Sequence, residues 1–438
     1  MGAGAMSEAV RQTRQRSVVV AGAGIPGLTL ALALAQANGP ALRVTLCDPG
    51  LGAGTARHAG RAYAVAAGGR RMFERLAVWD AVRHAAQPIR DMVVSDSRLA
   101  DPVRPVFLTF EHDSPAHVSP SQDFPAPEAE DGAPFAHMVE AEPLVAALLA
   151  AAHAAGVVFE PHGIVEATPD GRITRIGLSD GRIIEAALLV AADGARSRLR
   201  EAAKIGWVGW SYPQMGLVAT IGHERDHEGR AYEHFLPSGP FAILPLVPGG
   251  ALGHRSSIVW TERAADVPAL TGGGPEETLA EIERRFGLNL GRLSLERGPS
   301  AHPLAFGLAR SFRGERLALL GDAAHVIHPI AGQGLNLGLA GAAALAEAVT
   351  DALRLGLDPG SRDVLLRYER ARRFDTLAMG AMTDGLNRLF SNDLLPVRLV
   401  RDLGLGLVDR LPALKRLFIG EAAASRGSLP RLLRGEAL

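Results

Sequence analysis

The chain has 438 residues, of which 47% are hydrophobic, so it is long enough for two or more interleaved domains and for a large buried cofactor. Its 46 basic and 47 acidic residues leave a formal charge of -1, which argues against nucleic acid as a partner. The single cysteine, Cys47, excludes internal disulfides and cysteine-based metal sites. It fits a cytoplasmic, reducing environment and is typical of a small buried side chain.

The N-terminal region predicts a strand, a glycine turn, a helix and a second strand. Residues 1–16 have the composition of a disordered extension. The uncharged run 17–42 imitates a signal peptide or a membrane span, but glycines and a proline interrupt it near its start. A strand-like stretch ending at Asp48 follows, so a strand-turn-helix-strand unit is the better interpretation.

Further elements follow from hydrophobic periodicity and from turn residues. The expected elements are a helix at 68–86, extended chain at 90–111, a loop at 112–132, a helix at 142–155, a strand at 157–168, a hairpin at 171–184, a buried strand at 186–194, antiparallel strands with one helix near 275–286 over 206–300, and helices over 364–420. The stretch RLALLGDAAH returns to an α/β pattern. A sheet region is therefore inserted into an α/β layer.

Three glycines form the pattern GxGxxG between the first strand and the first helix. Without side chains, Gly22, Gly24 and Gly27 would let the backbone approach a pyrophosphate at the helix N-terminus. Asp48, which ends the second strand, is placed to accept a hydrogen bond from a ribose hydroxyl. Without the flanking strand and helix, the glycines would equally suit a tight turn, and Asp48 would equally suit the end of a strand. The strand-helix context favours nucleotide binding.

Two later carboxylates also follow predicted strands. Asp193 stands in AADGARSRLR and Asp322 in LLGDAAH. Taken singly, these are a turn residue and a helix cap. The glycine loop, the DG motif and the GD motif follow one another at the ends of predicted parallel strands. Together they would surround one long ligand, and their carboxylates would bind its sugar hydroxyls. A dinucleotide with a polyol, which is FAD, fits that need.

Here the sequence resembles a known family. GAGIPG, ADGARSRLR and GDAAHVIHPIAGQGLNLG look like the three fingerprints of the group A FAD-dependent aromatic hydroxylases, of the para-hydroxybenzoate hydroxylase type. RAYAVAAGGRRMFERLAVWDAV, HEGRAYEHFLPSGPFAILPL and YERARRFDTLAMGAMTDGLNRLF resemble the ubiquinone-biosynthesis hydroxylases more narrowly. Gly341 departs from the pattern, because the family usually has an aspartate at this position.

The resemblance implies roles for individual residues. The FAD pyrophosphate would face Gly22, Gly24 and Gly27, the adenosine ribose would contact Asp48, and the adenine would contact the backbone of Val165. Arg61 would bind the phosphates or the ribityl chain, and Asp322 would bind the ribityl hydroxyls. Asp193 would serve both FAD and the nicotinamide cofactor. Pro329, Gly332, Gln333, Gly334, Leu335 and Asn336 would lie beside the flavin ring, with backbone amides at a helix start stabilising negative charge.

The implied fold class is α/β. A Rossmann-like FAD-binding domain of the glutathione-reductase type would be interleaved with a mixed or antiparallel substrate sheet and followed by C-terminal helices. The FAD-binding domain would comprise 17–90, 133–205 and 306–355, the substrate domain 91–132 and 206–305, and the C-terminal helical region 356–438.

Other chemistry is less readable from the residues. His325 and His328 form a His-x-x-His pair, but Pro329 breaks the helix that a metal-binding pair needs, so structural histidines and no metal are expected. By resemblance, Phe235, Pro240 and Leu244 are candidates for lining the substrate site, although each equally suits a sheet core. No catalytic base is identified, because the family uses C4a-hydroperoxyflavin itself as the electrophile.

The implied function is hydroxylation of a polyprenyl phenol ring in ubiquinone biosynthesis, with NAD(P)H and O2. Two alternatives stay open: an FAD-dependent isoprenoid reductase or dehydrogenase, and a flavin-stabilised scaffold subunit. Residues 388–438 hold nine Lys/Arg and five Asp/Glu among leucines, which suits either packing on the flavin domain or peripheral contact with the inner face of the cytoplasmic membrane. Other ubiquinone-biosynthesis proteins and a second copy of the chain are further expected partners.

Overall fold

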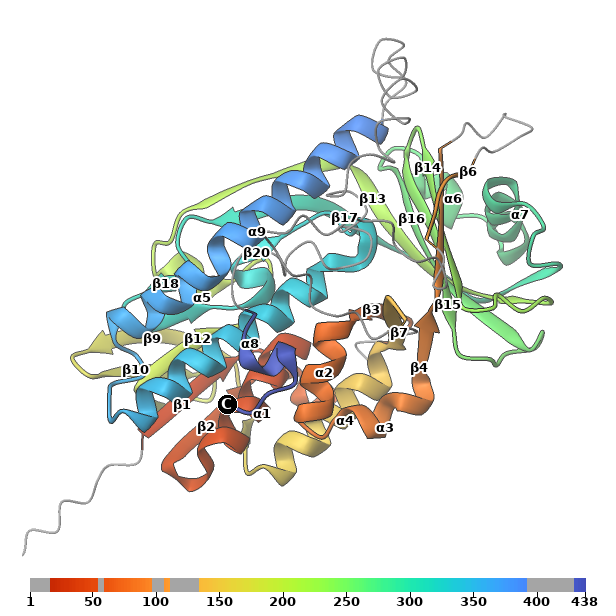
Figure 1. The fold of residues 1–438 in the computed structure, drawn as a ribbon. Helices are drawn as coiled ribbons and strands as arrows, with labels where there is room; N and C mark the ends of the chain where they lie inside the picture. The colour runs from red at the N-terminus through yellow and green to blue at the C-terminus, as the bar shows by residue number, and fades with distance from the viewer. Residues whose placement is uncertain (1–15, 54–58, 97–105, 111–133, 392–428) are drawn as a thin grey trace, which may run out of the picture.

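The computed structural model describes residues 16–53, 59–96, 106–110, 134–391 and 429–438 (Figure 1). The two main units of the fold are built on a six-stranded and an eight-stranded sheet, with two three-stranded sheets beside them. The expected extension before Arg16, the expected loop and most of the C-terminal stretch beyond Ser391 lie outside the described residues.

The first unit is built on a mainly parallel sheet with the strand order β18-β19-β12-β1-β2-β8. Because β1 pairs in parallel with β2 and β12, and β12 with β19, the carboxyl ends of these strands share one edge. The strands are β1 (Arg16–Ala21), β2 (Leu42–Cys47), β8 (Val158–Glu160), β12 (Leu188–Ala191), β18 (Arg313–Gly314) and β19 (Leu317–Leu319). Cys47 is buried and unpaired, as the sequence predicted.

The expectation for Arg16 was wrong. It begins β1 opposite Leu42, and its guanidinium donates hydrogen bonds to the backbone carbonyls of Gly356, at 2.7 Å, and Leu357. Two backbone carbonyls of a distant segment therefore hold the first strand residue in place.

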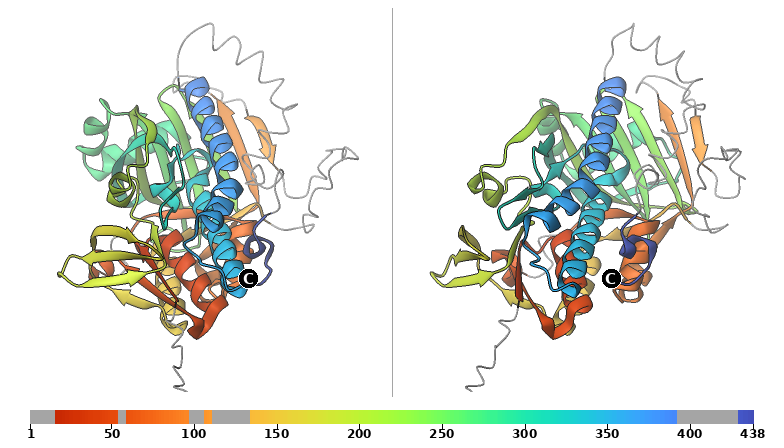
Figure 2. Two further views of the ribbon diagram at one scale, coloured as in Figure 1. Left: turned by 90° about the vertical axis from the view of Figure 1, so that its left-hand side faces the viewer. Right: turned by 60° about the vertical axis from the view of Figure 1, so that its left-hand side comes forward.

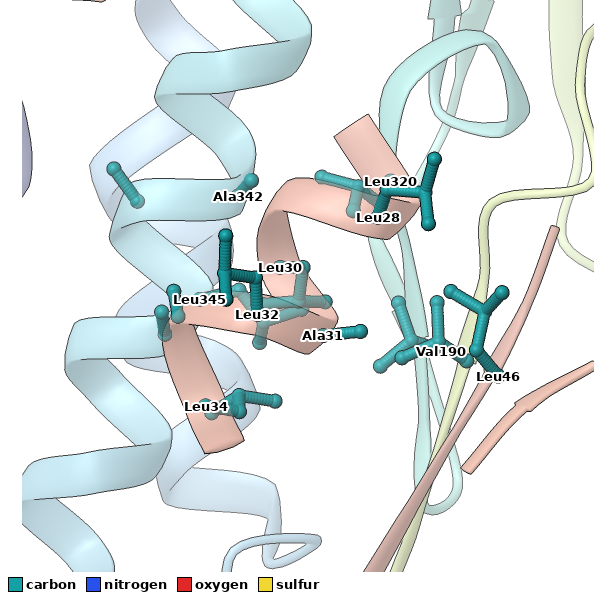
Figure 3. Packing of buried hydrophobic residues seen from close by; sticks show 14 of the residues in the cluster. Leu28, Leu30, Ala31, Leu32, Leu34, Leu46, Val190, Leu320, Ala342 and Leu345 are labelled. Carbon is teal, nitrogen blue, oxygen red and sulfur yellow. The ribbon is translucent and has the colours of Figure 1, made fainter. Parts of the chain in front are cut away.

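Helix α1 (Ile25–Asn38) is apolar on all sides because protein surrounds it. It packs against α4 (Ala141–Ala154), against α8 (Gln333–Arg354) and against the sheet. Figure 3 shows Leu30 and Leu32 beside Leu345 of α8. The uncharged run thus forms most of strand β1 and a core helix. None of the helices in the described ranges combines the length and apolarity needed to cross a membrane.

The single helix expected over 68–86 is interrupted. It forms α2 (Ala67–Arg75) and α3 (Trp79–Val82), followed by a 3₁₀ turn at Arg83–Ala85. Ala77 between the two helices has φ +56°, which a right-handed helix does not allow. Periodicity alone does not reveal this break.

The single strand expected over 157–168 is likewise divided, into β8 and β9 (Ile164–Asp170), which belong to different sheets. Pro161 lies between them and has no N–H group to donate to a ladder. β9 continues into β10 (Ile173–Leu178) and β11 (Ile183–Ala186), with the turns where the sequence predicted them.

The second unit is built on a sheet with the order β20-β17-β13-β16-β15-β14-β5-β6. Its pairs are antiparallel except β14 with β5. The strands are β5 (Asp91–Asp96), β6 (Val106–Phe110), β13 (Trp207–His223), β14 (Arg230–Leu236), β15 (Gly239–Leu246), β16 (His254–Arg263), β17 (Leu293–Ala309) and β20 (His325–Val326). The sheet therefore uses residues on both sides of the expected domain boundary at 305–306.

Helices cover this sheet unequally. α7 (Pro275–Phe286), which lies where the sequence predicted it, and α6 (Val267–Thr271), which was not expected, pack on one face. The opposite face turns toward α9 (Arg362–Phe390) and the first unit (Figures 1 and 2). A small sheet of β3 (Ala62–Ala66), β7 (Ala136–Glu140) and β4 (Ala86–Ile89) lies against β15 between the two units.

Candidate functional site

The turn between β1 and α1 packs closely against neighbouring backbone. Gly22 has φ +115°, and a Cβ atom there would lie 2.2 Å from the carbonyl oxygen of Ala192. A Cβ atom at Gly27 would lie 2.1 Å from the carbonyl oxygen of Gly22. Gly24 differs, because the nearest atom to its Cβ position, on Pro26, is 4.0 Å away. Packing explains the first and last glycines, whereas the middle one borders open space that suits a ligand.

The N-terminus of α1 faces this open space without a side-chain cap. Gly24 is the N-cap residue, and the first helical turn contains no acidic residue. The N–H groups of that turn and the positive end of the helix dipole therefore lack a side-chain acceptor. A pyrophosphate would supply one.

Asp48 fixes the end of β2 to the glycine turn. Its carboxylate accepts hydrogen bonds from the N–H groups of Ala23 and Gly50, at 2.7 and 2.6 Å. Its own N–H donates to the carbonyl oxygen of Glu160 at the end of β8. The carboxylate is thus held at the edge of the sheet beside the turn.

Val165 lies on β9 with 67% of its surface exposed. In the pairing of β9 with β10, Gly177 stands opposite Glu166 and Leu178 opposite Ile164, so Val165 occupies a bulge. A bulge leaves the backbone out of the regular ladder, which suits the backbone contact with adenine that the family resemblance implies.

Arg200 joins the DG motif to the GD motif. Its buried guanidinium donates hydrogen bonds of 3.0 Å to the carbonyl oxygens of Ala195 and Ala323. Ser197 caps α5 (Arg198–Ala202) by accepting a bond from the N–H of Arg200. Two loops that are distant in sequence are therefore fixed to each other.

The three candidate charged residues near these loops are exposed. Asp193 accepts a weak hydrogen bond of 3.4 Å from the N–H of Leu199. Asp322 exposes its side chain, yet surrounding protein raises the pKa of its carboxyl by desolvation, and the positive charge of Arg61 opposes the rise. A carboxylate that is both exposed and closely surrounded is typical of the wall of an open cleft.

The N-terminus of α8 is a second uncapped helix start. Gly332 is its N-cap with φ +62°, and the first turn contains no acidic residue. Gly334 has no atom within 4 Å of its Cβ position. A Cβ atom at Gly338 would lie 2.8 Å from the ring of Pro26 at the start of α1. The positive ends of two helices therefore lie close together.

Asn336 uses its side chain to hold β3. The amide nitrogen donates to the carbonyl oxygen of Ala64 and the amide oxygen accepts from the N–H of Ala66, both at 3.0 Å. Its side chain is thus a positioning group. Of the neighbouring candidates, Gln333 and Leu335 are buried and Pro329 is exposed.

Phe235 of β14 and Pro240 and Leu244 of β15 share one face of the eight-stranded sheet. Phe235 and Pro240 are buried directly opposite each other, and Leu244 is half-buried. Their strand neighbours Leu236, Phe241 and Ile243 pack on the other face, with α6 and α7. Leu244 packs in the cluster that also contains Ala64. The three candidates therefore face the β3 and α8 side.

His325 and His328 are buried, and burial lowers the pKa of each to about 4. Both are therefore neutral near pH 7. Within the described ranges, the group of potential metal ligands that lies close together is Glu160, His162 and Asp180. Arg182 already pairs with both of these carboxylates, so it takes the place that a cation would need.

A family model described as an FAD binding domain matches residues 15–379. Ubiquinone hydroxylase UbiL of Rhodospirillum rubrum is 41% identical over 428 residues, covering 95% of this chain and 92% of the relative. The 3-demethoxyubiquinol 3-hydroxylase of Escherichia coli is 32% identical, covering 91% and 96%. The chain belongs to the FAD-dependent ubiquinone hydroxylases.

A solved structure shares the fold of this hydroxylase. The p-nitrophenol 4-monooxygenase of Pseudomonas putida superposes with a TM-score of 0.72 at 20% identity, covering 94% of this chain and 99% of the other. The solved structure shows the mixed α/β architecture, whereas the family model and the relatives identify the protein as a flavoprotein monooxygenase.

The residues of the hydroxylase fit FAD on structural grounds. Two uncapped helix starts meet beside Gly24 and Gly334, which no protein atom approaches closely. Asp322 stands beside them on an open wall. Diphosphate, ribityl and flavin groups each have a matching partner in this arrangement.

Sequence reasoning missed the positioning groups of the hydroxylase. Arg200 stood in a quoted motif but received no role, and Asn336 received only a backbone role. Both act through hydrogen bonds to residues more than 100 positions away in the chain. Short-range spacing contains no signal for such partners.

Proposed function

We propose that this hydroxylase inserts one oxygen atom into the aromatic ring of a polyprenyl phenol in ubiquinone biosynthesis. The observation that carries the proposal is the mainly apolar sheet face with Phe235 and Pro240, which lies on the side of β3, where Ala64 approaches the start of α8. The names of the relatives support the choice of substrate.

FAD would supply the redox chemistry, since NAD(P)H reduces the flavin and the reduced flavin activates O2. In the proposed arrangement, Gly24 and the start of α1 bind the pyrophosphate and Asp48 binds the adenosine ribose. Asp322 and Arg61 bind the ribityl chain and phosphates, and the backbone at Gly332–Asn336 binds the flavin ring. The remaining contacts proposed are Val165 with adenine and Asp193 with FAD and the nicotinamide cofactor.

The sheet face would exclude water from one side of the reaction site. Phe235 and Pro240 are buried, and Leu244 packs with the alanines of β3. An aromatic ring and the start of a prenyl chain would fit such a surface, and exclusion of water would protect the activated oxygen.

The test uses purified protein loaded with FAD. Prenyl phenols of several chain lengths should stimulate both NAD(P)H oxidation and O2 uptake, and the product should gain one oxygen atom. Stimulated NAD(P)H oxidation with reduction of the prenyl chain, and without O2 uptake, would instead indicate an isoprenoid reductase. Reduced protein that consumes no O2 with any phenol would indicate a scaffold.

We further propose three partners: the inner face of the cytoplasmic membrane, other ubiquinone-biosynthesis proteins and a second copy of the chain. Support for membrane contact comes from α9, which exposes Phe374 and Leu377 three residues apart and leads into the leucine- and arginine-rich stretch. The full chain should sediment with anionic vesicles, and the variant with serine at both positions should stay in the supernatant. Equal amounts of wild type and of the serine variant in the vesicle pellet would contradict the role of this face.

A further inference from the structure

Glu233, in the middle of β14, is a buried carboxyl for which packing gives no reason. Only 5% of its surface is exposed, and among the described residues no hydrogen-bond or ion-pair partner contributes to the pKa of its carboxyl. The residues paired with it on the neighbouring strands are Val94 and Ala242. An apolar side chain would fit these neighbours at a lower desolvation cost.

The carboxyl of Glu233 points away from the helix-covered core of the sheet. The rings of Tyr232 and His234, on either side of it, lie 5.2 and 5.9 Å from the ring of Phe286 in α7. Because successive side chains of a strand alternate between faces, Glu233 projects from the opposite face, together with Phe235. That is the face proposed to contact the substrate ring.

This face meets the loop that would hold the flavin ring. Ala231, two residues before Glu233 on the same face, belongs to the cluster that packs with Ala64. Ala64 is bonded to Asn336 and lies 3.4 Å from the Cβ position of Gly332. Two strand residues span about 7 Å. Glu233 therefore lies within two strand residues of the cluster that connects this face of the sheet to Ala64, beside the start of α8.

We propose that Glu233 is a catalytic base that accepts the proton of the substrate's phenolic hydroxyl. The O–H bond breaks, its electron pair stays on the phenolate oxygen, and the proton forms the neutral carboxylic acid of Glu233. No oxidant or reductant is involved. A phenolate donates more electron density into the ring than a phenol does, which assists attack on electrophilic oxygen. This assignment rests on the proposed function.

The acidity of Glu233 suits this task. Burial, with no charged neighbour contributing, raises the pKa of its carboxyl to about 7. A base is most effective when its pKa lies near the working pH, because it is then available and still basic enough to bind a proton.

The test compares Glu233→Gln with Glu262→Gln. Glu262 is also buried in this sheet, but on the α7 side, where it pairs with Arg285. Each FAD-loaded protein is assayed with prenyl phenols carrying increasing numbers of ring fluorines, which make the hydroxyl more acidic. Glu233→Gln should slow hydroxylation of the unsubstituted phenol about 100-fold. The defect of Glu233→Gln should shrink to a few-fold with the most acidic phenol. The effect of Glu262→Gln on the rate, relative to wild type, should be the same with every phenol.

An equal defect of Glu233→Gln with every phenol, or no defect, would overturn the assignment. A second readout needs no turnover: the absorbance of a prenylated 4-nitrophenol bound near neutral pH. Wild type should bind part of it as the yellow phenolate, and Glu233→Gln should bind it as the neutral phenol. Identical spectra would contradict the role of Glu233. Failure of wild type to hydroxylate any prenyl phenol would instead contradict the proposed function, with the spectra still deciding the proton acceptor.

Discussion

The guanidinium of Arg200 donates a hydrogen bond of 3.0 Å to the carbonyl oxygen of Ala323. Arg200 lies in the helix that follows β12, and Ala323 ends the 3₁₀ turn Gly321–Ala323 that contains Asp322. The bond is buried and therefore costly to leave unmade. It fixes the separation of two loops that contact different parts of the proposed FAD site.

Arg200→Lys should weaken FAD binding about tenfold, because an ammonium group cannot reach both carbonyl oxygens in the fork geometry of a guanidinium. Titration of apoprotein with FAD, followed by flavin fluorescence, measures this. Arg198→Lys, at an exposed neighbouring position, is the matched control and should bind FAD as wild type does. Equal affinity of the two variants would argue against a role for the Arg200 bond.

Asp322→Ala should purify without the yellow colour of bound FAD, because the ribityl hydroxyls lose their carboxylate acceptor. The residue is exposed, so the variant should unfold near the wild-type temperature. Absorbance of the purified protein and a thermal scan provide the two measurements. Full FAD content in this variant would contradict the assignment.

Gly24 and Gly27 should respond differently to alanine. Gly24→Ala should leave the apoprotein as stable as wild type and weaken FAD binding, because its Cβ position meets only open space in the protein. Gly27→Ala should destabilise the apoprotein by about 3 kcal/mol, because its Cβ would collide with the carbonyl oxygen of Gly22. Chemical denaturation of both apoproteins tests this, and equal destabilisation would refute the distinction.

The neighbours of Gly341 explain why this position holds a glycine. A Cβ atom there would lie 3.0 Å from Leu320 and 3.6 Å from the hydroxyl of Tyr368. Gly341→Asp should therefore destabilise the fold by about 3 kcal/mol, through crowding and an unpaired buried carboxylate. Gly341→Ala should be near neutral, because better helix propensity offsets the close contact. Unfolding curves that rank the two variants in the reverse order would contradict this packing account.

Glu233 should make stability depend on pH. Its pKa rises from 4.5 to about 7 on folding, so between these values the folded state binds more protons than the unfolded state. Stability should fall as pH rises through this window, by a total of about 3 kcal/mol. The Glu233→Gln variant should lack this component in denaturation curves collected across the window. Parallel pH profiles of both proteins would show that the carboxyl is not desolvated.

The fold was readable from the sequence where local pattern and tertiary setting agree. The glycine turn, α1, α4 and α7 lie where periodicity and turn residues predicted them. The two failures of a single predicted element, at Ala77 and Pro161, are points where backbone geometry rather than hydrophobicity decides. Arg16 failed for a different reason, because its partners at Gly356 and Leu357 lie in a distant segment.

The candidate site was readable only in part. Gly24 and Asp322 belong to motifs with fixed local spacing, so their placement could be predicted. Glu233 could not be singled out, because one acidic residue in an alternating strand is as often exposed as buried. Whether Glu233 can contact the substrate depends on which face of β14 packs against α7, and strand order and register determine that face.

The most direct test of the central claim is turnover of a prenyl phenol under ¹⁸O2 by the FAD-loaded enzyme with NAD(P)H. The proposed function predicts a ring-hydroxylated product that contains one ¹⁸O atom, with the second oxygen atom of O2 released as water. A product without the label, or one altered only in its prenyl chain, would contradict the claim that this protein is a ring hydroxylase.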